Sequence, residues 1–414
     1  MERLISALGA LVILGVAWSC CPRALKREVR PRTIGMGVLL LVVIAALVLK
    51  TPVNELFSLG NALIERLLGF TAEGARFVFG GLVSDTTTFG FVFAFQVLPT
   101  IVFFSALMSL LYHVGLMPFV IERCGRFLSR TVHVSGAESF STVADVFVGQ
   151  TEAPLVVSPY LPRMTRSELN ACMVAGYATT AGGVLAAYVA MLSPRVPGIA
   201  GHLMAASVMG APAALVIAKL MLPESEHPET DAEIASSLPR TTVNGLDAIA
   251  QGTSDGLKLA LNVGAMLIVF LAFSALINAL LATVGGWFGA ALSLEGIFAV
   301  LFYPLAWLLG VPSEDVTKVA TLLGQKTALN EFIAYSHMAS SLAADPAWLS
   351  ERGRLIASYA LCGFANFGSI GIQIGGYAAL APARRADISS LALRAMIGGL
   401  LATCLVACVA GVFV

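Results

Sequence analysis

Long apolar runs follow one another along most of the chain and are separated by short polar connections. A run of about 20 apolar residues forms a helix long enough to cross the hydrocarbon core of a bilayer. Eight runs fit this description, near residues 4–21, 34–49, 90–115, 167–192, 199–222, 257–284, 355–378 and 390–413. The pattern therefore predicts an all-α polytopic membrane protein with eight transmembrane helices.

Two further apolar stretches, 138–162 and 312–341, are interrupted by Gly, Pro or charged residues and do not make clean spans. Lys and Arg in short loops favour the cytoplasmic side of a membrane. The basic loop after the first run places the N-terminus outside. When the spans are counted from there, Arg163 and Arg384 lie on the cytoplasmic side only if each interrupted stretch enters and leaves the membrane through the same face. We therefore expect two re-entrant helical hairpins and periplasmic termini, although the acidic loop 223–239 does not support this scheme.

The stretch 53–84 mixes charged residues into an apolar pattern, which is typical of helices that lie at the membrane interface. The charged residues are Glu55, Glu65, Arg66, Glu73 and Arg76. We expect interfacial helices here.

Composition supports a membrane protein and excludes several other classes. Hydrophobic residues make up 57% of the chain and charged residues 12%, whereas soluble domains carry roughly 25% charged residues. The zero net charge and the lack of basic, aromatic-rich runs argue against nucleic-acid binding. The seven cysteines have no CxxC spacing and the five histidines no HExxH motif, so neither a disulfide framework nor a zinc site is expected.

The two interrupted stretches are each followed by a glycine-interrupted helix, which indicates a duplication. "VGQTEAP" is followed by "GYATTAGG", and "GQKTALNEF" is followed by "GFANFGSIG". Inverted repeats with paired broken helices are typical of secondary transporters, whose site lies near the midplane. The predicted division is N-terminal scaffold spans and interfacial helices (1–134), first repeat (135–222), cytoplasmic linker and interfacial helix (223–256), scaffold span and interfacial segment (257–311) and second repeat (312–414).

Glu152 and Glu331 fall at the two predicted hairpin tips. A carboxylate at membrane depth costs roughly 2.5–3.5 kcal/mol on insertion scales, so its presence favours a functional role. The alternative is that each glutamate only satisfies a neighbouring group and fixes packing. The same two interpretations apply to a further set of residues, namely Gln150, Thr151, Asn330, Phe364, Asn366 and Ser369.

The helix breaks are expected at Gly149, Gly182–Gly183, Gly363 and Gly368, with Pro154 helping to end a half-helix. Asp145, Thr179 and Thr180 lie close to these breaks. Carboxylate, hydroxyl and freed carbonyl oxygens suit Na⁺ or a proton relay. Asp145 could instead be a buried partner between helices.

Three segments carry a resemblance to a known family: "GQTEAPLVVSPYLPRMTRSEL", "NEFIAY" and "CGFANFGSIGIQIGGYAALAPARRADIS". They resemble the signature segments of the concentrative nucleoside transporter family. The resemblance extends from about residue 90 to the end and more loosely over the first two spans. It implies an eight-span protomer with two re-entrant hairpins, a homotrimer and elevator-type alternating access.

The resemblance also implies a role for individual residues. Gln150, Thr151 and Glu152 would hydrogen-bond the nucleobase, and Phe364 would pack on it. Glu331, Asn366 and Ser369 would hold the ribose hydroxyls, which suits a carboxylate that accepts from a diol. The coupling cation would lie near Asp145, Val148, Thr179 and Thr180. Sodium-coupled relatives have Asn where this chain has Asp145, so Na⁺ and H⁺ both remain open.

We therefore expect cation-coupled uptake of nucleosides of the uridine, cytidine or adenosine type across the inner membrane, with membrane lipid as the surroundings and no cofactor. Another small polar solute, such as a dicarboxylate, is the first alternative. It would need an arginine or a half-helix N-terminus to bind the substrate carboxylate, and neither hairpin tip nor helix break holds an arginine. A membrane-embedded enzyme is the second, and no nucleophile–base pair or metal cluster is visible for it. The sequence does not rank purine nucleosides against pyrimidine nucleosides as substrates. Gly149–Gln150 resembles the same positions in broadly selective members of the family.

Overall fold

The computed structural model describes residues 1–50, 54–84, 92–230, 242–289 and 291–414. In these ranges all regular secondary structure is helical, as predicted. Seven helical stretches in the described ranges are long and apolar enough to cross a membrane: Glu2–Ser19, Pro31–Lys50, Phe93–His113, Arg166–Leu192, Ile199–Met221, Gly245–Trp287 and Pro382–Phe413. The prediction of an all-α polytopic membrane protein is confirmed.

The seventh predicted span, 355–378, is not continuous. It consists of α18 (Glu351–Leu361) and α19 (Phe367–Leu380), separated by residues 362–366. The span predicted at 167–192 is broken in the same way, into α11 (Arg166–Ala178) and α12 (Gly182–Leu192). Both helices therefore contain a non-helical segment in the middle, and Gly363 lies in the second one. The breaks expected at Gly182–Gly183 and Gly368 are wrong by a few residues, because these glycines lie in the first turns of α12 and α19.

The two interrupted stretches form helix–turn–helix units. The first contains α9 (Gly136–Phe147), the single turn α10 (Ala153–Val156) and η2 (Leu161–Arg163). The second contains α16 (Val316–Ala328) and α17 (Glu331–Ala344). We call them hairpin 1 and hairpin 2. That they are re-entrant stays a prediction.

The expected role of Pro154 is wrong. α9 already ends at Phe147, and Pro154 lies in the first turn of α10, where its missing N–H is not needed. Gly149 makes the break instead, because its φ of 96° lies in a region that favours glycine. A Cβ atom at Gly149 would come within 2.8 Å of the Ala181 Cβ, so the tip of hairpin 1 packs closely against the break between α11 and α12.

Local capping explains where several of these helices begin. Ser135 with Glu138 starts α9, and Thr165 with Glu168 starts α11, each as a reciprocal capping box. Asn330 caps α17 and Asn366 caps α19 through their side-chain oxygens. An N-cap of this kind is worth about 1 kcal/mol, so the sequence itself sets the two asparagines at the start of half-helices.

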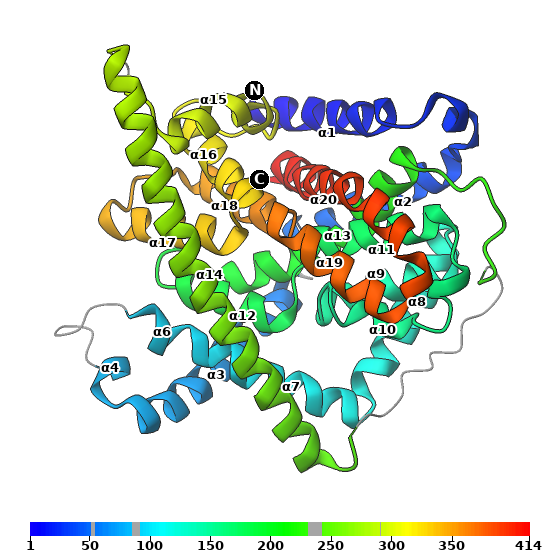
Figure 1. Ribbon diagram of the computed structural model, residues 1–414, viewed down its shortest axis with the longest axis horizontal. Helices are drawn as coiled ribbons and strands as arrows, with labels where there is room; N and C mark the ends of the chain where they lie inside the picture. Colours follow the sequence, from blue (N-terminus) through cyan, green and yellow to red (C-terminus); the bar gives the residue numbers. More distant parts are fainter. Residues whose placement is uncertain (51–53, 85–91, 231–241, 290) are drawn as a thin grey trace.

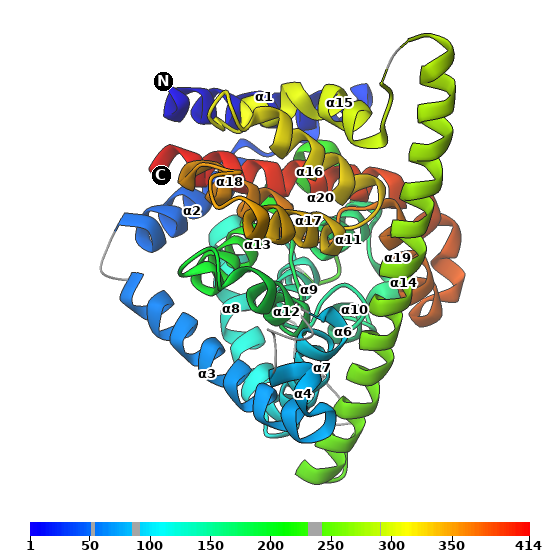
Figure 2. The same ribbon diagram turned by 90° about the vertical axis from the view of Figure 1, so that its left-hand side faces the viewer.

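Helices α9, α11, α13 (Ile199–Met221) and α20 (Arg385–Phe413) form the interior of the molecule (Figure 1). α14 (Gly245–Trp287) runs along the outside and packs lengthwise on α7 (Leu98–His113) (Figure 2). The apolar window of α13 is 89% buried, but that of α14 is only 6% buried in the single chain. α14 therefore offers its apolar surface to lipid or to other chains.

The remaining helices surround this core. They are α1 (Glu2–Ser19), η1 (Arg23–Glu28), α2 (Pro31–Lys50), α3 (Asn54–Phe79), α4 (Gly81–Ser84), α6 (Phe93–Gln96), α8 (Leu116–Val132), α15 (Leu294–Leu308) and η3 (Pro382–Arg384). The two termini lie side by side (Figure 1), and the Arg3 guanidinium donates to the Val414 carbonyl over 2.6 Å. Their periplasmic location stays a prediction.

Several predicted boundaries fall on or beside segments outside the described residues. Residue 53 of the predicted interfacial stretch and residues 231–241 of the predicted linker belong to these segments. The expected boundary between residues 256 and 257 falls inside α14, which continues without interruption from Gly245 to Trp287. The division of the chain into scaffold and repeats stays a prediction.

Candidate functional site

A cavity of about 810 Å³ lies between the two hairpin tips, the break before α19, and helices α7 and α14. Small-molecule sites commonly occupy 300–1,000 Å³. All seven residues predicted to bind substrate line this cavity: Gln150, Thr151, Glu152, Glu331, Phe364, Asn366 and Ser369. The fold therefore brings together residues that are more than 200 positions apart in the chain.

Hairpin 1 contributes an amide that is fixed from two sides. The Gln150 Nε2 donates to Ser369 Oγ over 3.2 Å, and the Gln150 Oε1 accepts from Gln373 Nε2 over 3.1 Å. Gln373 also donates to the Met173 carbonyl over 3.1 Å. Because Gln373 is fully buried on α19, it holds the amide of Gln150 in a fixed orientation.

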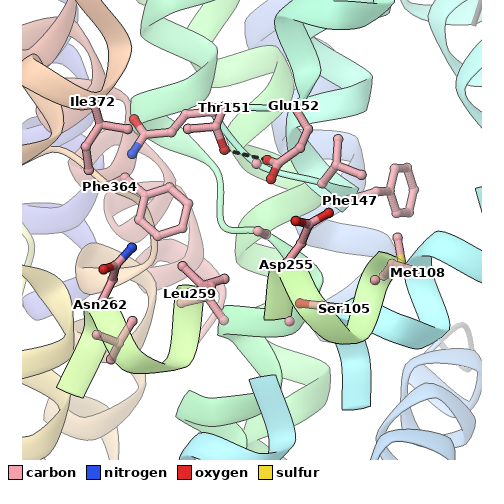
Figure 3. Close-up of a pocket in the computed structure, with 18 of the residues that line it drawn as sticks. Ser105, Met108, Phe147, Thr151, Glu152, Asp255, Leu259, Asn262, Phe364 and Ile372 are labelled. Carbon is pink, nitrogen blue, oxygen red and sulfur yellow. Dashed lines mark hydrogen bonds between the residues drawn. The ribbon is translucent and has the colours of Figure 1, made fainter. Parts of the chain in front are cut away.

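The next two residues of hairpin 1 are exposed to the cavity. Thr151 Oγ1 donates to Glu152 Oε2 over 2.6 Å (Figure 3). This bond uses one of about four lone-pair positions of the carboxylate, so Glu152 can still accept from a ligand. The Glu152 carboxylate and the lone pairs of the Thr151 hydroxyl can accept hydrogen bonds from donors on the edge of a flat polar ring.

Hairpin 2 contributes a carboxylate whose two oxygens each accept one hydrogen bond. Glu331 Oε1 accepts from the Tyr188 hydroxyl over 2.9 Å, and Oε2 accepts from Asn366 Nδ2 over 3.0 Å. The Asn366 Oδ1 accepts from the Ser369 backbone N–H over 2.8 Å, which fixes the orientation of its amide. A carboxylate has about four lone-pair positions, so Glu331 can still accept from two donors on a ligand.

The wall formed by α14 was not predicted from the sequence. Gln251, Asp255 and Asn262 line the cavity from this helix. Asp255 points toward Glu152, while Asn262 and Leu259 lie opposite Phe364 (Figure 3). A spacing of four and then seven residues puts the three polar groups on one helical face, and that periodicity was the signal available in the sequence. Tyr188 and Gln373, each a polar residue in an apolar helix, were also missed.

The residues predicted to hold the cation are only partly brought together. Val148 lines the cavity, but Asp145, Thr179 and Thr180 are completely buried behind it. Thr179 Oγ1 donates to the Ala175 carbonyl over 2.9 Å, and Thr180 Oγ1 shares a hydrogen bond of 3.3 Å with Cys362 Sγ. Neither hydroxyl is bonded to Asp145.

Asp145 has a buried carboxylate with no hydrogen-bond partner for either oxygen in the described part of the chain. It lies against the last turn of α11, because a Cβ atom at Gly176 would be 3.3 Å from Asp145 Oδ1. The C-terminal end of a helix carries partial negative charge. An unpaired carboxylate beside such an end is unfavourable unless a cation or a proton is bound there.

Three descriptions of protein families match parts of this chain. The family described as "Na+ dependent nucleoside transporter C-terminus" matches residues 202–411, and the corresponding N-terminus description matches residues 8–82. A third description, "Nucleoside recognition", matches residues 94–195.

The chain is also similar to individual proteins. It is 44% identical to an uncharacterized transporter of Haemophilus influenzae, over 100% of this chain and 98% of that protein. It is 42% identical to solute carrier family 28 member 3 of Mus musculus over 99% of this chain, which spans 59% of that longer protein. The structure of CNTnw in an inward-facing substrate-bound state is 42% identical, with a TM-score of 0.93, over 100% of this chain and 98% of that one.

Proposed function

The chain belongs to the family of Na⁺-dependent nucleoside transporters, and on this premise we propose that it takes up nucleosides across the inner membrane together with a cation. It is a multi-pass membrane transporter and not an enzyme. The observation that carries the proposal is the cavity in which both hairpin tips and the break before α19 present fixed polar groups to one space.

The two sides of the cavity suit the two parts of a nucleoside. Glu331 and Asn366 offer acceptors and a donor side by side, which fits the ribose diol together with Ser369. Gln150, Thr151 and Glu152 offer an amide, a hydroxyl and a carboxylate to the edge of the base. Phe364 lines the cavity with an aromatic ring on which the base packs.

Sodium is the proposed coupling ion, bound behind the cavity between α9 and the end of α11. The unpaired carboxylate of Asp145, which lies on α9 against the last turn of α11, supports this placement. Freed carbonyls at half-helix ends coordinate Na⁺ in other transporters. Val148, Thr179 and Thr180 would supply the remaining oxygens through their backbone. The alternative is that Asp145 carries the proton of an H⁺-coupled transporter.

The movement and assembly are proposed on the family resemblance. The two repeats would carry the substrate past a scaffold that includes α7 and α14, in an elevator-type alternating-access cycle. The uncovered apolar surface of α14 supports contact with lipid and with two further copies in a homotrimer. The hairpins would re-enter from opposite faces, with both termini in the periplasm.

Uptake of radiolabelled uridine into proteoliposomes tests the function directly. We expect accumulation that rises with an inward Na⁺ gradient at fixed pH and is competed by other ribonucleosides. Competition by a dicarboxylate or an amino acid in place of nucleosides would show that the cavity binds another polar solute. Uptake that is independent of Na⁺ but driven by an inward proton gradient would indicate that Asp145 carries the coupling proton.

A further inference from the structure

Lys326 is a buried basic residue inside hairpin 2. Its side chain is 0% exposed, and it lies on α16, four residues before Asn330 at the tip. Burial of an ammonium group costs several kcal/mol unless strong partners compensate. The hydrogen-bond partners of Lys326 therefore indicate its role.

The partners of Lys326 are neutral oxygens. Nζ donates to the Ala360 carbonyl over 2.8 Å and to Thr403 Oγ1 over 3.0 Å. No carboxylate of the described residues forms an ion pair with it. Ala360 is the second-last residue of α18, so its carbonyl is one of the last four, which have no partner inside the helix. A carbonyl at a half-helix end together with a hydroxyl is a ligand set that also suits a small monovalent cation.

The first repeat has the opposite charge at the matching position. Asp145 and Lys326 are each the third residue from the end of the first helix of their hairpin. α9 packs on α11 just as α16 packs on α18, and both α11 and α18 end at a break. In the first repeat the hairpin helix presents a carboxylate without a partner to the end of α11. In the second, it presents an ammonium to the end of α18.

We propose that the Lys326 ammonium is a built-in cation, which takes in the second repeat the place that the coupling cation takes in the first. It joins the hairpin to the end of α18 and thereby positions the break at 362–366 against the tip, where Asn366 meets Glu331. One repeat then needs a cation from solution and the other does not. Lys326 is a positioning residue in this arrangement, since it does not line the cavity. The inference concerns ion coupling and rests on the proposed transport function.

Three variants test the proposal in the full-length protein. Lys326→Ala removes the ammonium and leaves space for a small cation. Lys326→Met removes the charge but fills most of the space. Lys318→Met is the matched control on the same helix, because Lys318 is partly exposed and bonds to Asp315 and to the Trp348 carbonyl, away from the tip.

The first readout is the melting temperature of purified protein, with and without ethylammonium, against choline at equal ionic strength. We expect Lys326→Ala to be stabilised selectively by ethylammonium. Wild type, Lys326→Met and Lys318→Met should show no such selective effect. Equal responses of Lys326→Ala and Lys326→Met would overturn the proposal, whether or not the protein transports nucleosides.

The second readout is uridine uptake as a function of Na⁺. We expect uptake by Lys326→Ala to fall roughly tenfold or more at the Na⁺ concentration that saturates wild type, since the α18 carbonyl loses its partner. Ethylammonium, or higher Na⁺ with a steeper dependence, should restore it. If uridine uptake by Lys326→Met depends on Na⁺ as in the wild type, the proposal that Lys326 acts as a built-in cation is refuted. A wild-type protein without uridine uptake would refute the transport function, and the melting experiment would still decide on Lys326.

Discussion

Replacing Glu331 with glutamine removes the charge at the tip of hairpin 2 but keeps the shape of the side chain. In the wild type both carboxylate oxygens accept a hydrogen bond, one from Tyr188 and one from Asn366. The introduced amide group would have to face one of these donors with its own N–H. Asn366 cannot turn to accept it without losing the bond to the Ser369 N–H. The new amide therefore points toward Tyr188, whose hydroxyl can rotate and accept.

The loss follows from the hydrogen bonds that remain for the ribose. Bonds to a charged acceptor contribute about 1.5–3 kcal/mol and those to a neutral one about 0.5–1.5 kcal/mol. Two ribose hydroxyls would therefore lose roughly 2–3 kcal/mol in total, because each falls by about 1–1.5 kcal/mol. That corresponds to about 30- to 150-fold weaker binding of uridine. The fold should be unaffected, since the neutral side chain is cheaper to bury than the carboxylate.

The assay is isothermal titration of purified protein with uridine and with 2′,3′-dideoxyuridine, followed by uptake measurements. Wild type should discriminate strongly between the two ligands, and Glu331→Gln should discriminate between them about 30- to 150-fold less. Tyr188→Phe is a matched control, because it removes one donor to Glu331 but leaves its charge. If the affinity of Glu331→Gln for uridine is within twofold of wild type, Glu331 does not bind the ribose.

Three further experiments probe the same geometry. Asp145→Ala should weaken the dependence of uridine uptake on Na⁺ at fixed pH, and a variant with unchanged Na⁺ dependence would move the ion elsewhere. Gln373→Leu removes the donor to Gln150 and should weaken nucleoside binding about tenfold, measured by titration; unchanged affinity would show that Gln150 needs no support. Cysteines placed at Arg163 and Arg384, in a background without native cysteines, should react only with reagents on the cytoplasmic side. Labelling from the periplasm would show that the predicted topology is inverted.

The sequence by itself determined the membrane class and most of the polar site. Apolar runs of spanning length leave no other stable arrangement for the backbone in lipid than helices that satisfy their own hydrogen bonds. Within such runs a residue such as Glu152 or Glu331 is costly, so its presence predicts a functional role. Local chemistry also located the starts of half-helices, because Asn330 and Asn366 act as N-caps that depend only on nearby residues.

Only the tertiary structure decided which groups hold those residues in place. Tyr188 and Gln373 looked like ordinary polar residues in apolar helices until the fold brought them to Glu331 and Gln150. Pro154 was assigned the wrong role, because proline is compatible with both the end and the beginning of a helix and the backbone of Gly149 chose between them. The partners of Lys326 depend on helices 34 and 77 residues further along the chain. The periodicity of polar residues in the sequence predicts which face of a helix is polar. A contact between distant segments depends on how the whole chain packs.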